Sequence, residues 1–218
     1  MAGPDDPIYR IYAEQLPNTY DEVLSPEYAE WKKTAIDASL LKIGDSVLVF
    51  CCGTGNDFSA ILDKIGTQGS IVGLDFSMPM LLKAREKIVQ YGWKNVSLTC
   101  ADATRFSSRE DALFDAGVCT LGMSIIPQWQ AAYRNLLSNI KIGGEVIIGD
   151  MTWTAGIQYW RNFSIVKRAS EYGGSYRGHA NSKKLFSLMV RELEHVRRKS
   201  FFHGAYQYCL GTKGPSSE

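Results

Sequence analysis

The feature that most constrains the fold is a short apolar run that ends in glycines. Val47–Cys52 is wholly apolar and is followed directly by Gly53-Thr54-Gly55. Its length and β-branched content are typical of a strand buried on both faces of a parallel sheet. Glycines at the end of such a strand let the backbone approach a ligand closely, because no side chain obstructs it. The run therefore predicts a buried strand whose carboxyl end faces a ligand.

A strand and helix rhythm continues along the chain. Helices are expected at about 57–65, 78–91 and 128–140, and further strands at 70–75, 96–100, 116–121 and 145–150. An irregular insert to about residue 181 then precedes a helix at about 182–195 and a hairpin-like pair of strands through Phe201 and Tyr206–Leu210. Repeated βα units predict a doubly wound α/β fold, with a mostly parallel sheet of seven strands, the last antiparallel.

Composition excludes several classes of protein. The 218 residues are 45% hydrophobic and 22% charged, which excludes a disordered or fibrous chain. A net charge of +1 gives no reason to expect a nucleic-acid partner. The five cysteines lack a Cys-x-x-Cys pair, so we expect reduced thiols and no metal site. Without a long apolar run or a secretory signal at the N-terminus, a cytoplasmic location is expected.

Two phosphate-binding motifs fail at the glycine loop. The frame that starts at Gly53 has Phe58 in the third glycine position of the dinucleotide fingerprint, and no P-loop lysine follows. Asp75 ends the second strand, where a carboxylate can accept both hydroxyls of a ribose. Asp102 ends the third strand and could accept from an exocyclic amine, or simply cap a turn. The pattern favours a nucleoside cofactor without a pyrophosphate.

These segments resemble the class I S-adenosylmethionine-dependent methyltransferases. Val47–Gly55 is similar to the first motif of the family, Gly73–Ser77 to its ribose motif, Ala101–Ala103 to its adenine motif and Ile142–Val146 to the turn into its fifth strand. The resemblance spans about 47–152, roughly half of the chain. It implies a Rossmann-like methyltransferase fold, with S-adenosylmethionine as cofactor and S-adenosylhomocysteine as product.

The resemblance also implies an organisation and a set of site residues. We expect one methyltransferase domain over 1–218, with a helical lid at 1–40, a cofactor-binding half at 45–150, and an acceptor-side insert with the C-terminal strands at 151–212. The glycines would flank the methionine part of the cofactor, Asp75 would hold the ribose and Asp102 the adenine. The expected cofactor-binding residues are Cys52, Gly53, Thr54, Gly55, Asp57, Asp75, Phe76, Met80, Asp102, Ala103, Cys119 and Thr120.

Two departures from the family pattern lie at the glycine loop. The family usually carries an acid where Val49 stands and a first glycine where Cys51 stands. Both changes remove contacts near the methionine end of the cofactor, and Asn56 or Asp57 could compensate. A cofactor-binding protein without transferase activity is therefore one alternative function.

The acceptor is less constrained than the cofactor. Leu121–Trp129 and Phe202–Tyr206 are similar to the betaine-lipid and phospholipid N-methyltransferases, whereas Gly73–Lys87 is equally close to the ubiquinone and menaquinone C-methyltransferases. We expect a small-molecule or lipid-headgroup acceptor, methylated at an amine nitrogen. The alternative is C-methylation of a quinone-type aromatic ring.

Tyr20 and His179 are the candidate catalytic residues. Asn18-Thr19-Tyr20-Asp21 resembles a Tyr-Asp pair that the family places near the cofactor, and a tyrosine ring could face a cation. The other interpretation is that this tyrosine packs the lid against the domain. His179 follows a glycine-rich stretch that could form a lid over the acceptor, or could be a solvated loop.

Charge is distributed unevenly along the sequence. Residues 151–200 hold ten basic and three acidic side chains, and residues 1–50 hold four basic and nine acidic ones. An anionic acceptor or peripheral contact with an anionic membrane would explain the basic segment, and so would a solvated helix face. Trp153, Trp160 and Phe163 would suit a membrane interface. The oligomeric state stays open.

Overall fold

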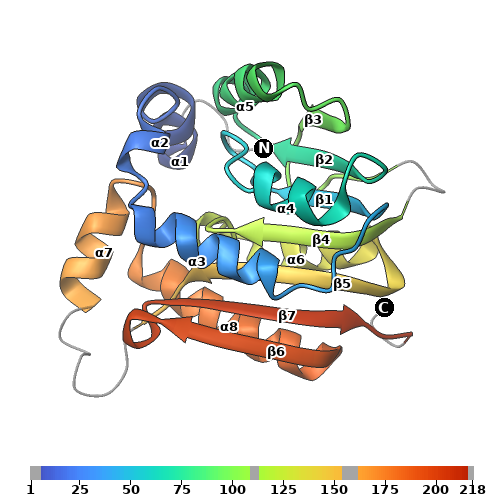
Figure 1. The fold of residues 1–218 in the computed structure, drawn as a ribbon. Helices are drawn as coiled ribbons and strands as arrows, with labels where there is room; N and C mark the ends of the chain where they lie inside the picture. Colours follow the sequence, from blue (N-terminus) through green and yellow to red (C-terminus); the bar gives the residue numbers. More distant parts are fainter. Residues whose placement is uncertain (1–5, 109–112, 154–161, 216–218) are drawn as a thin grey trace.

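The computed structural model describes residues 6–108, 113–153 and 162–215. Seven strands form a single sheet in the order β3-β2-β1-β4-β5-β7-β6 (Figure 1). β1 to β5 are parallel, whereas β7 is antiparallel to both β5 and β6. The expected mostly parallel, seven-stranded sheet is confirmed. The strands are β1 Ser46–Phe50, β2 Ser70–Asp75, β3 Val96–Cys100, β4 Phe114–Thr120, β5 Ile140–Met151, β6 Leu193–Phe201 and β7 Tyr206–Lys213.

Helices cover both faces of this sheet. The helices are α1 Pro7–Arg10, η1 Ile11–Gln15, α2 Tyr20–Val23, α3 Pro26–Asp37, α4 Phe58–Ile65, α5 Met78–Tyr91, η2 Met123–Ile125, α6 Trp129–Ser138, α7 Asn162–Ser170, α8 Tyr176–Glu192 and η4 Phe202–Gly204. α3, α4 and α5 contribute to one buried apolar cluster, and α6 and α8 to another. No helix in the described ranges is long and apolar enough to span a bilayer.

Local sequence signals explain β1 and the elements from β2 to β3. β1 is almost entirely buried, as its apolar run predicts. At α5, the Ser77 hydroxyl accepts from the backbone N–H of Met80, and Pro79 occupies the first turn. Gly92 ends α5 in the left-handed conformation at φ +66°. The predicted spans of β2, α5 and β3 match the structure to the residue.

The irregular insert expected before residue 181 is wrong, because α7 and the start of α8 lie there. Gly173 makes the turn between the two helices at φ +75°, and the Ser175 hydroxyl caps α8 by accepting from the backbone N–H of Gly178. A Cβ at Gly178 would lie 2.2 Å from the carbonyl oxygen of Ser124. This glycine therefore serves a close helix contact rather than chain flexibility.

The N-terminal helices α1, η1 and α2 lie across the carboxyl ends of the parallel strands (Figure 1). Tyr12 and Leu16 form a small apolar cluster with Met80 of α5. The Ser77 hydroxyl donates to the backbone oxygen of Tyr12 at 2.7 Å. Asp21 of α2 forms an ion pair with Lys87 of α5, with 2.6 Å between Asp21 Oδ2 and Lys87 Nζ. The N-terminal segment is therefore attached both to the loop that follows β2 and to α5.

The basic segment of the sequence lies partly on the edge of the sheet. β6 is the edge strand, and Arg198 and Lys199 are exposed on it. Arg197 of this strand pairs with the buried carboxylate of Glu145. Charged side chains on an edge strand oppose pairing with the strand of another molecule. This location accounts for part of the charge excess without a ligand.

Substitution at Gly149 provides a test of the packing between β5 and β7. A Cβ at Gly149 would lie 2.1 Å from the Tyr206 hydroxyl oxygen, which has no hydrogen-bond partner in the described part of the chain. We expect Gly149→Ala to lower the free energy of unfolding by about 1–3 kcal/mol through overpacking. In a Tyr206→Phe background, which removes the clashing atom, most of this loss should disappear. Urea denaturation of the four proteins measures it, and an equal loss in both backgrounds would contradict this packing.

Candidate active site

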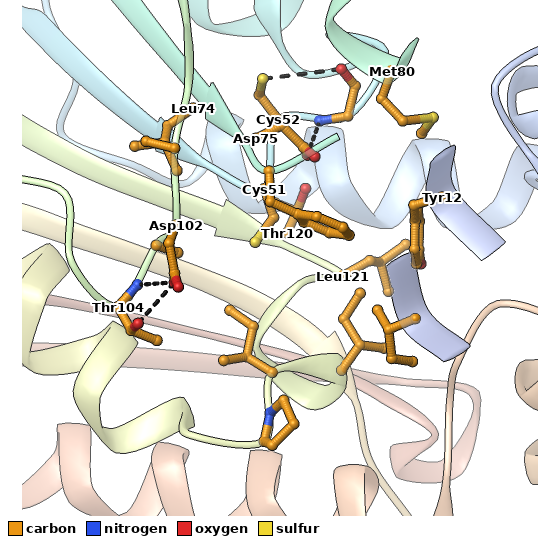
Figure 2. A pocket seen from close by; sticks show the side chains of 18 of the residues that line it. Tyr12, Cys51, Cys52, Leu74, Asp75, Met80, Asp102, Thr104, Thr120 and Leu121 are labelled. Atoms are coloured by element: carbon orange, nitrogen blue, oxygen red, sulfur yellow. Dashed lines mark hydrogen bonds between the residues drawn. The ribbon is translucent and has the colours of Figure 1, made fainter. Parts of the chain in front are cut away.

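A cavity of about 600 Å³ lies at the carboxyl ends of β1, β2 and β4. Its lining also includes residues of the N-terminal helices and of the segment between β4 and α6 (Figure 2). β1 and β4 are neighbours in the sheet, but β2 and β3 lie on one side of them and β5 on the other. In doubly wound sheets a ligand binds at this point, where the strand order reverses. The cavity is therefore the candidate active site.

Asp75 connects two loops at the floor of the cavity. Its Oδ2 accepts from the backbone N–H of Gly53 at 2.8 Å, and its Oδ1 accepts from that of Ser77 at 2.9 Å (Figure 2 shows the first of these). Burial raises the pKa of Asp75 to about 6, although these backbone hydrogen bonds oppose the shift. A buried carboxylate with remaining lone pairs suits a pair of ribose hydroxyls.

The glycine loop after β1 keeps the shape that ligand binding requires. Gly53 has φ +53°, and a Cβ there would lie 3.4 Å from Cε of Met80. Cys51 also has a positive φ of 53°, so it holds the conformation that a glycine would adopt without strain. Val49 lies in the core under the loop with 1% of its surface exposed. The two departures from the family pattern therefore leave the loop intact.

Asp102 closes a turn and lines the cavity at the same time. Its Oδ1 accepts from the backbone N–H of Thr104 at 2.8 Å and from the Thr104 hydroxyl at 2.7 Å (Figure 2). Partial burial raises the pKa of Asp102, but its hydrogen bonds, those from Thr104 among them, outweigh this effect and lower the pKa to about 2. The side chain is thus a fixed anion at the end of β3.

Most of the expected cofactor-binding residues line this one cavity. Those that do are Cys52, Gly53, Asp75, Phe76, Met80, Asp102, Ala103 and Thr120. The lining does not include Thr54, Gly55, Asp57 or Cys119. The Thr54 hydroxyl instead donates to Asp21 at 2.6 Å, Gly55 packs on Phe58, and Cys119 is fully buried in the core. Asn56, proposed as a compensating residue, does line the cavity.

Lys32 is a lining residue that the sequence analysis missed. Its side chain is 7% exposed, and its Nζ lies 3.2 Å from Oδ1 of Asp57. The second oxygen of Asp57 accepts from the Thr120 hydroxyl at the end of β4. Lys32 shares the buried side of α3 with Ala35 and Ile36. Lys32 precedes Ala35 and Ile36 by three and four residues, a spacing that places the three side chains on one face of a helix. The paired lysines of Trp31-Lys32-Lys33 instead suggest a solvent-exposed helix surface, so this signal was not recognised.

The structure separates the two candidate catalytic residues. Tyr20 lines the cavity, and its ring centroid lies 6.3 Å from that of Tyr12. Burial raises the pKa of Tyr20, although the nearby Lys32 ammonium opposes this. His179 is absent from the lining and lies in α8 with 1% of its surface exposed. Both the lid loop and the solvated loop expected around His179 are therefore wrong.

Burial also explains the protonation state of His179. Its ring packs against Trp153, with 6.3 Å between centroids, and neither ring nitrogen has a hydrogen-bond partner among the described residues. Burial without a partner lowers the pKa of His179 to about 4. The imidazole is neutral at pH 7.

One wall of the cavity is apolar, and the sequence analysis did not assign its residues individually. Leu121, Ile125, Ile126, Pro127 and Ala131 line it, between the end of β4 and the first turns of α6. The cavity lining contains no described residue from the basic segment 151–200. The expectation that this segment builds the acceptor site is therefore not met by residues 151–153 or 162–200. Residues 154–161, which include Trp160, lie outside the described residues.

Comparison with known proteins agrees with this geometry. The family model described as the ubiE/COQ5 methyltransferase family matches residues 11–164. The chain belongs to this family. It is 30% identical over 224 residues to a demethylmenaquinone methyltransferase of Bacillus cereus, a match that covers 93% of this chain and 94% of the relative. A demethylmenaquinone methyltransferase of Shouchella clausii is 31% identical over 121 residues, which cover 56% of this chain and about half, 51%, of that relative.

A solved structure supports the fold. A SAM-dependent methyltransferase from Aquifex aeolicus superposes with a TM-score of 0.67 over 90% of this chain and 97% of that one, at 16% identity. At this identity the likeness concerns the fold alone. With the family membership, it identifies the chain as an S-adenosylmethionine-dependent methyltransferase, and therefore as an enzyme. The family resemblance and the cofactor inferred from the sequence are confirmed.

The residues present fit this cofactor. The buried Asp75 carboxylate can accept ribose hydroxyls, Asp102 and Ala103 flank the place expected for an adenine, and Gly53 leaves room that a side chain would fill. Bound S-adenosylmethionine supplies an electrophilic methyl group on a sulfonium. The protein groups supply orientation and the exclusion of water, which account for much of the rate in transfers of this type.

The pKa of Asp75 predicts a pH-dependent affinity for S-adenosylhomocysteine. The carboxylate form accepts two hydroxyls and the protonated form does not, so binding should favour the ionised state. With a pKa of about 6 in the free protein, we expect affinity to be constant above pH 7 and about tenfold weaker at pH 5. Calorimetric titration from pH 5 to 8 measures the profile.

Two variants test the assignment of this pH profile. Asp75→Asn should bind more weakly at pH 7.5 and lose the dependence on pH. Asp150 is a matched control, because burial raises its pKa to about 6 as well, yet it does not line the cavity. Asp150→Asn should keep the wild-type slope, and a slope that disappears in this variant instead would assign the titration to the wrong residue.

Proposed function

We propose that this enzyme methylates a ring carbon of a demethylmenaquinone-type quinone in its reduced, hydroquinone form. The observation that carries the proposal is the match to a demethylmenaquinone methyltransferase over nearly the whole length of both chains. It favours the quinone alternative over the amine acceptor that the resemblance to lipid N-methyltransferases suggested.

The lining of the cavity is consistent with a flat aromatic acceptor. The wall that includes Leu121, Ile125 and Ile126 offers apolar contacts for a ring system. Lys32 is the buried cation of the described lining, and its ammonium offers hydrogen-bond donors to an oxygen of the acceptor. The ring hydroxyls of a hydroquinone supply such an oxygen.

The reduced form of the acceptor follows from the chemistry of the transfer. The attacking atom must donate an electron pair to the methyl carbon, and a hydroquinone ring is electron-rich whereas a quinone ring is electron-poor. The new bond joins the ring carbon to the methyl group while the bond from sulfur to that group breaks. The ring carbon then loses its proton, which restores the aromatic ring and leaves S-adenosylhomocysteine.

We assign Tyr20 the role of a contact to the reactants rather than that of a base. Because its pKa is raised, its hydroxyl keeps its proton at neutral pH and can donate a hydrogen bond to a reactant. The side chain lines the cavity next to Lys32 and Tyr12. His179, absent from the lining, takes no part in this proposal.

A lipid-soluble quinone would be met at a membrane surface, so peripheral contact with an anionic membrane remains part of the proposal. Phe163 of α7 and Phe202 of η4 are 68% and 44% exposed. Exposed aromatic rings suit a lipid interface. Co-sedimentation with anionic vesicles at low salt tests this contact, and its absence would remove it.

Methyl-labelled cofactor provides the test of the acceptor. We expect the purified protein to transfer a ¹³C-methyl group to demethylmenaquinol under reducing conditions, with a product signal typical of a methyl group on an aromatic carbon. Transfer should stop when the reductant is omitted, and Asp75→Asn should lose it at sub-saturating cofactor. Methylation of phosphatidylethanolamine, with none of the quinol, would overturn the proposal in favour of the amine.

A further inference from the structure

We infer that Lys32 is a catalytic residue that contacts the acceptor, with its ammonium paired to an ionised ring hydroxyl so that a phenolate is methylated. This inference rests on the proposed function, because it needs an acceptor with a ring hydroxyl. It assigns a chemical role to the buried cation in the cavity lining.

The position of Lys32 gives it access to a reactant. It lies on the inner side of α3, near the middle of the helix, and its side chain is 7% exposed. Its Nζ pairs with Asp57 Oδ1 at 3.2 Å, and no other partner of this ammonium is present among the described residues. An ammonium has three N–H donors, so donors remain for a ligand in the cavity that Lys32 lines.

The groups around Lys32 keep it charged. Burial alone would lower the pKa of its ammonium, but Asp57 and Tyr20 outweigh this effect and raise it. The titratable groups that face it are Asp57 from the loop before α4, Tyr20 from α2, Cys119 from β4 and Cys52 from the loop after β1. A charge held away from water acts more strongly on a neighbouring ion than an exposed one does.

An anionic oxygen of the acceptor suits this arrangement better than the amino-acid end of the cofactor. That end carries both a carboxylate and an ammonium, so it needs an anion as well as a cation as partners. Asp57 is not among the lining residues, and its two oxygens are already engaged by Lys32 and Thr120. Of the Lys32, Asp57 and Thr120 cluster, the only charge that lines the cavity is therefore the Lys32 ammonium. A phenolate needs a cation as its partner and no anion.

A cation beside the acceptor would favour ionisation of the ring hydroxyl. A ring hydroxyl with a pKa of about 10, like that of tyrosine, is ionised in only about one molecule in a thousand at pH 7. A phenolate donates electron density to the ring carbons beside it far better than a neutral phenol does. If Lys32 stabilises that ion, the hydroxyl proton leaves to solvent before transfer, and the ring carbon attacks the methyl group from the ionised form.

The test compares Lys32→Met with Lys33→Met, its exposed neighbour, which pairs with Asp37 on the outside of α3. We expect Lys32→Met to bind S-adenosylhomocysteine within about threefold of wild type and to lose at least about a hundredfold in kcat/KM for the quinol at pH 7. The loss should shrink as pH rises towards 10, because the acceptor then ionises unaided. Lys33→Met should match wild type, and Lys32→Arg should recover part of the rate.

Two further experiments distinguish a role of Lys32 in catalysis from a role in folding, and distinguish failure of this inference from failure of the proposed function. Lys32→Met/Asp57→Asn removes both charges of the buried pair, so it should stay folded and still show the pH-dependent loss. The second arm uses 1-naphthol, whose absorption distinguishes its neutral and ionised forms, bound to the complex with S-adenosylhomocysteine. Wild type should lower the pKa of bound naphthol, and Lys32→Met should not, whether or not the quinol is the acceptor.

Each contrary result has a definite meaning. Equal losses of S-adenosylhomocysteine affinity and kcat/KM would assign Lys32 to the cofactor and overturn the inference. An unchanged kcat/KM, or a loss that is the same at every pH, would make Lys32 a structural residue. Ionised naphthol without quinol methylation would overturn the proposed acceptor and leave the role of Lys32 standing.

Discussion

The active site depends on one buried carboxylate. Asp75 accepts from the backbone of Gly53 on one side and of Ser77 on the other, so it connects the loop after β1 to the start of α5. Ser77 in turn donates its hydroxyl to the backbone of Tyr12, which attaches the N-terminal helices. Burying this charge is costly, and the raised pKa of Asp75 records that cost. The hydroxyls of a ribose would offset part of it, so the cofactor stabilises the site that binds it.

The sequence predicted the parts of the fold that local signals determine. β2 and α5 have the predicted spans because an apolar run, the Ser77 cap and Gly92 act within a few residues of the elements they define. The region from α7 into the start of α8 was mispredicted because Gly173 and Gly178 are typical of a flexible stretch. The requirement for Gly178 comes from Ser124, which is distant in sequence and meets it only in the packed structure. Such a contact leaves no local signal.

The same distinction applies to the active site. Asp75 and Asp102 could be found from the sequence because an acid at the end of a parallel strand reaches the same edge of the sheet as its neighbours. Lys32 and Ile125 could not be assigned in this way, since their places depend on how α3 and the segment before α6 dock. His179 shows the reverse error: its glycine-rich surroundings suggested exposure, and packing of α8 buries it.

On the proposed assignment, charge divides the cavity between the cofactor and the acceptor. The cofactor end carries the carboxylates of Asp75 and Asp102 on strand ends, and these accept hydrogen bonds from hydroxyl and amine groups. Lys32 and the apolar wall come from α3 and from the segment after β4, outside the β1–β3 unit that carries Asp75 and Asp102. Because the two halves are built from different elements, the acceptor end can change its charge and shape while Asp75 and Gly53 stay in place. On the proposed assignment a ring with an anionic oxygen suits the Lys32 end, because that oxygen could pair with the ammonium while the ring contacts the apolar wall.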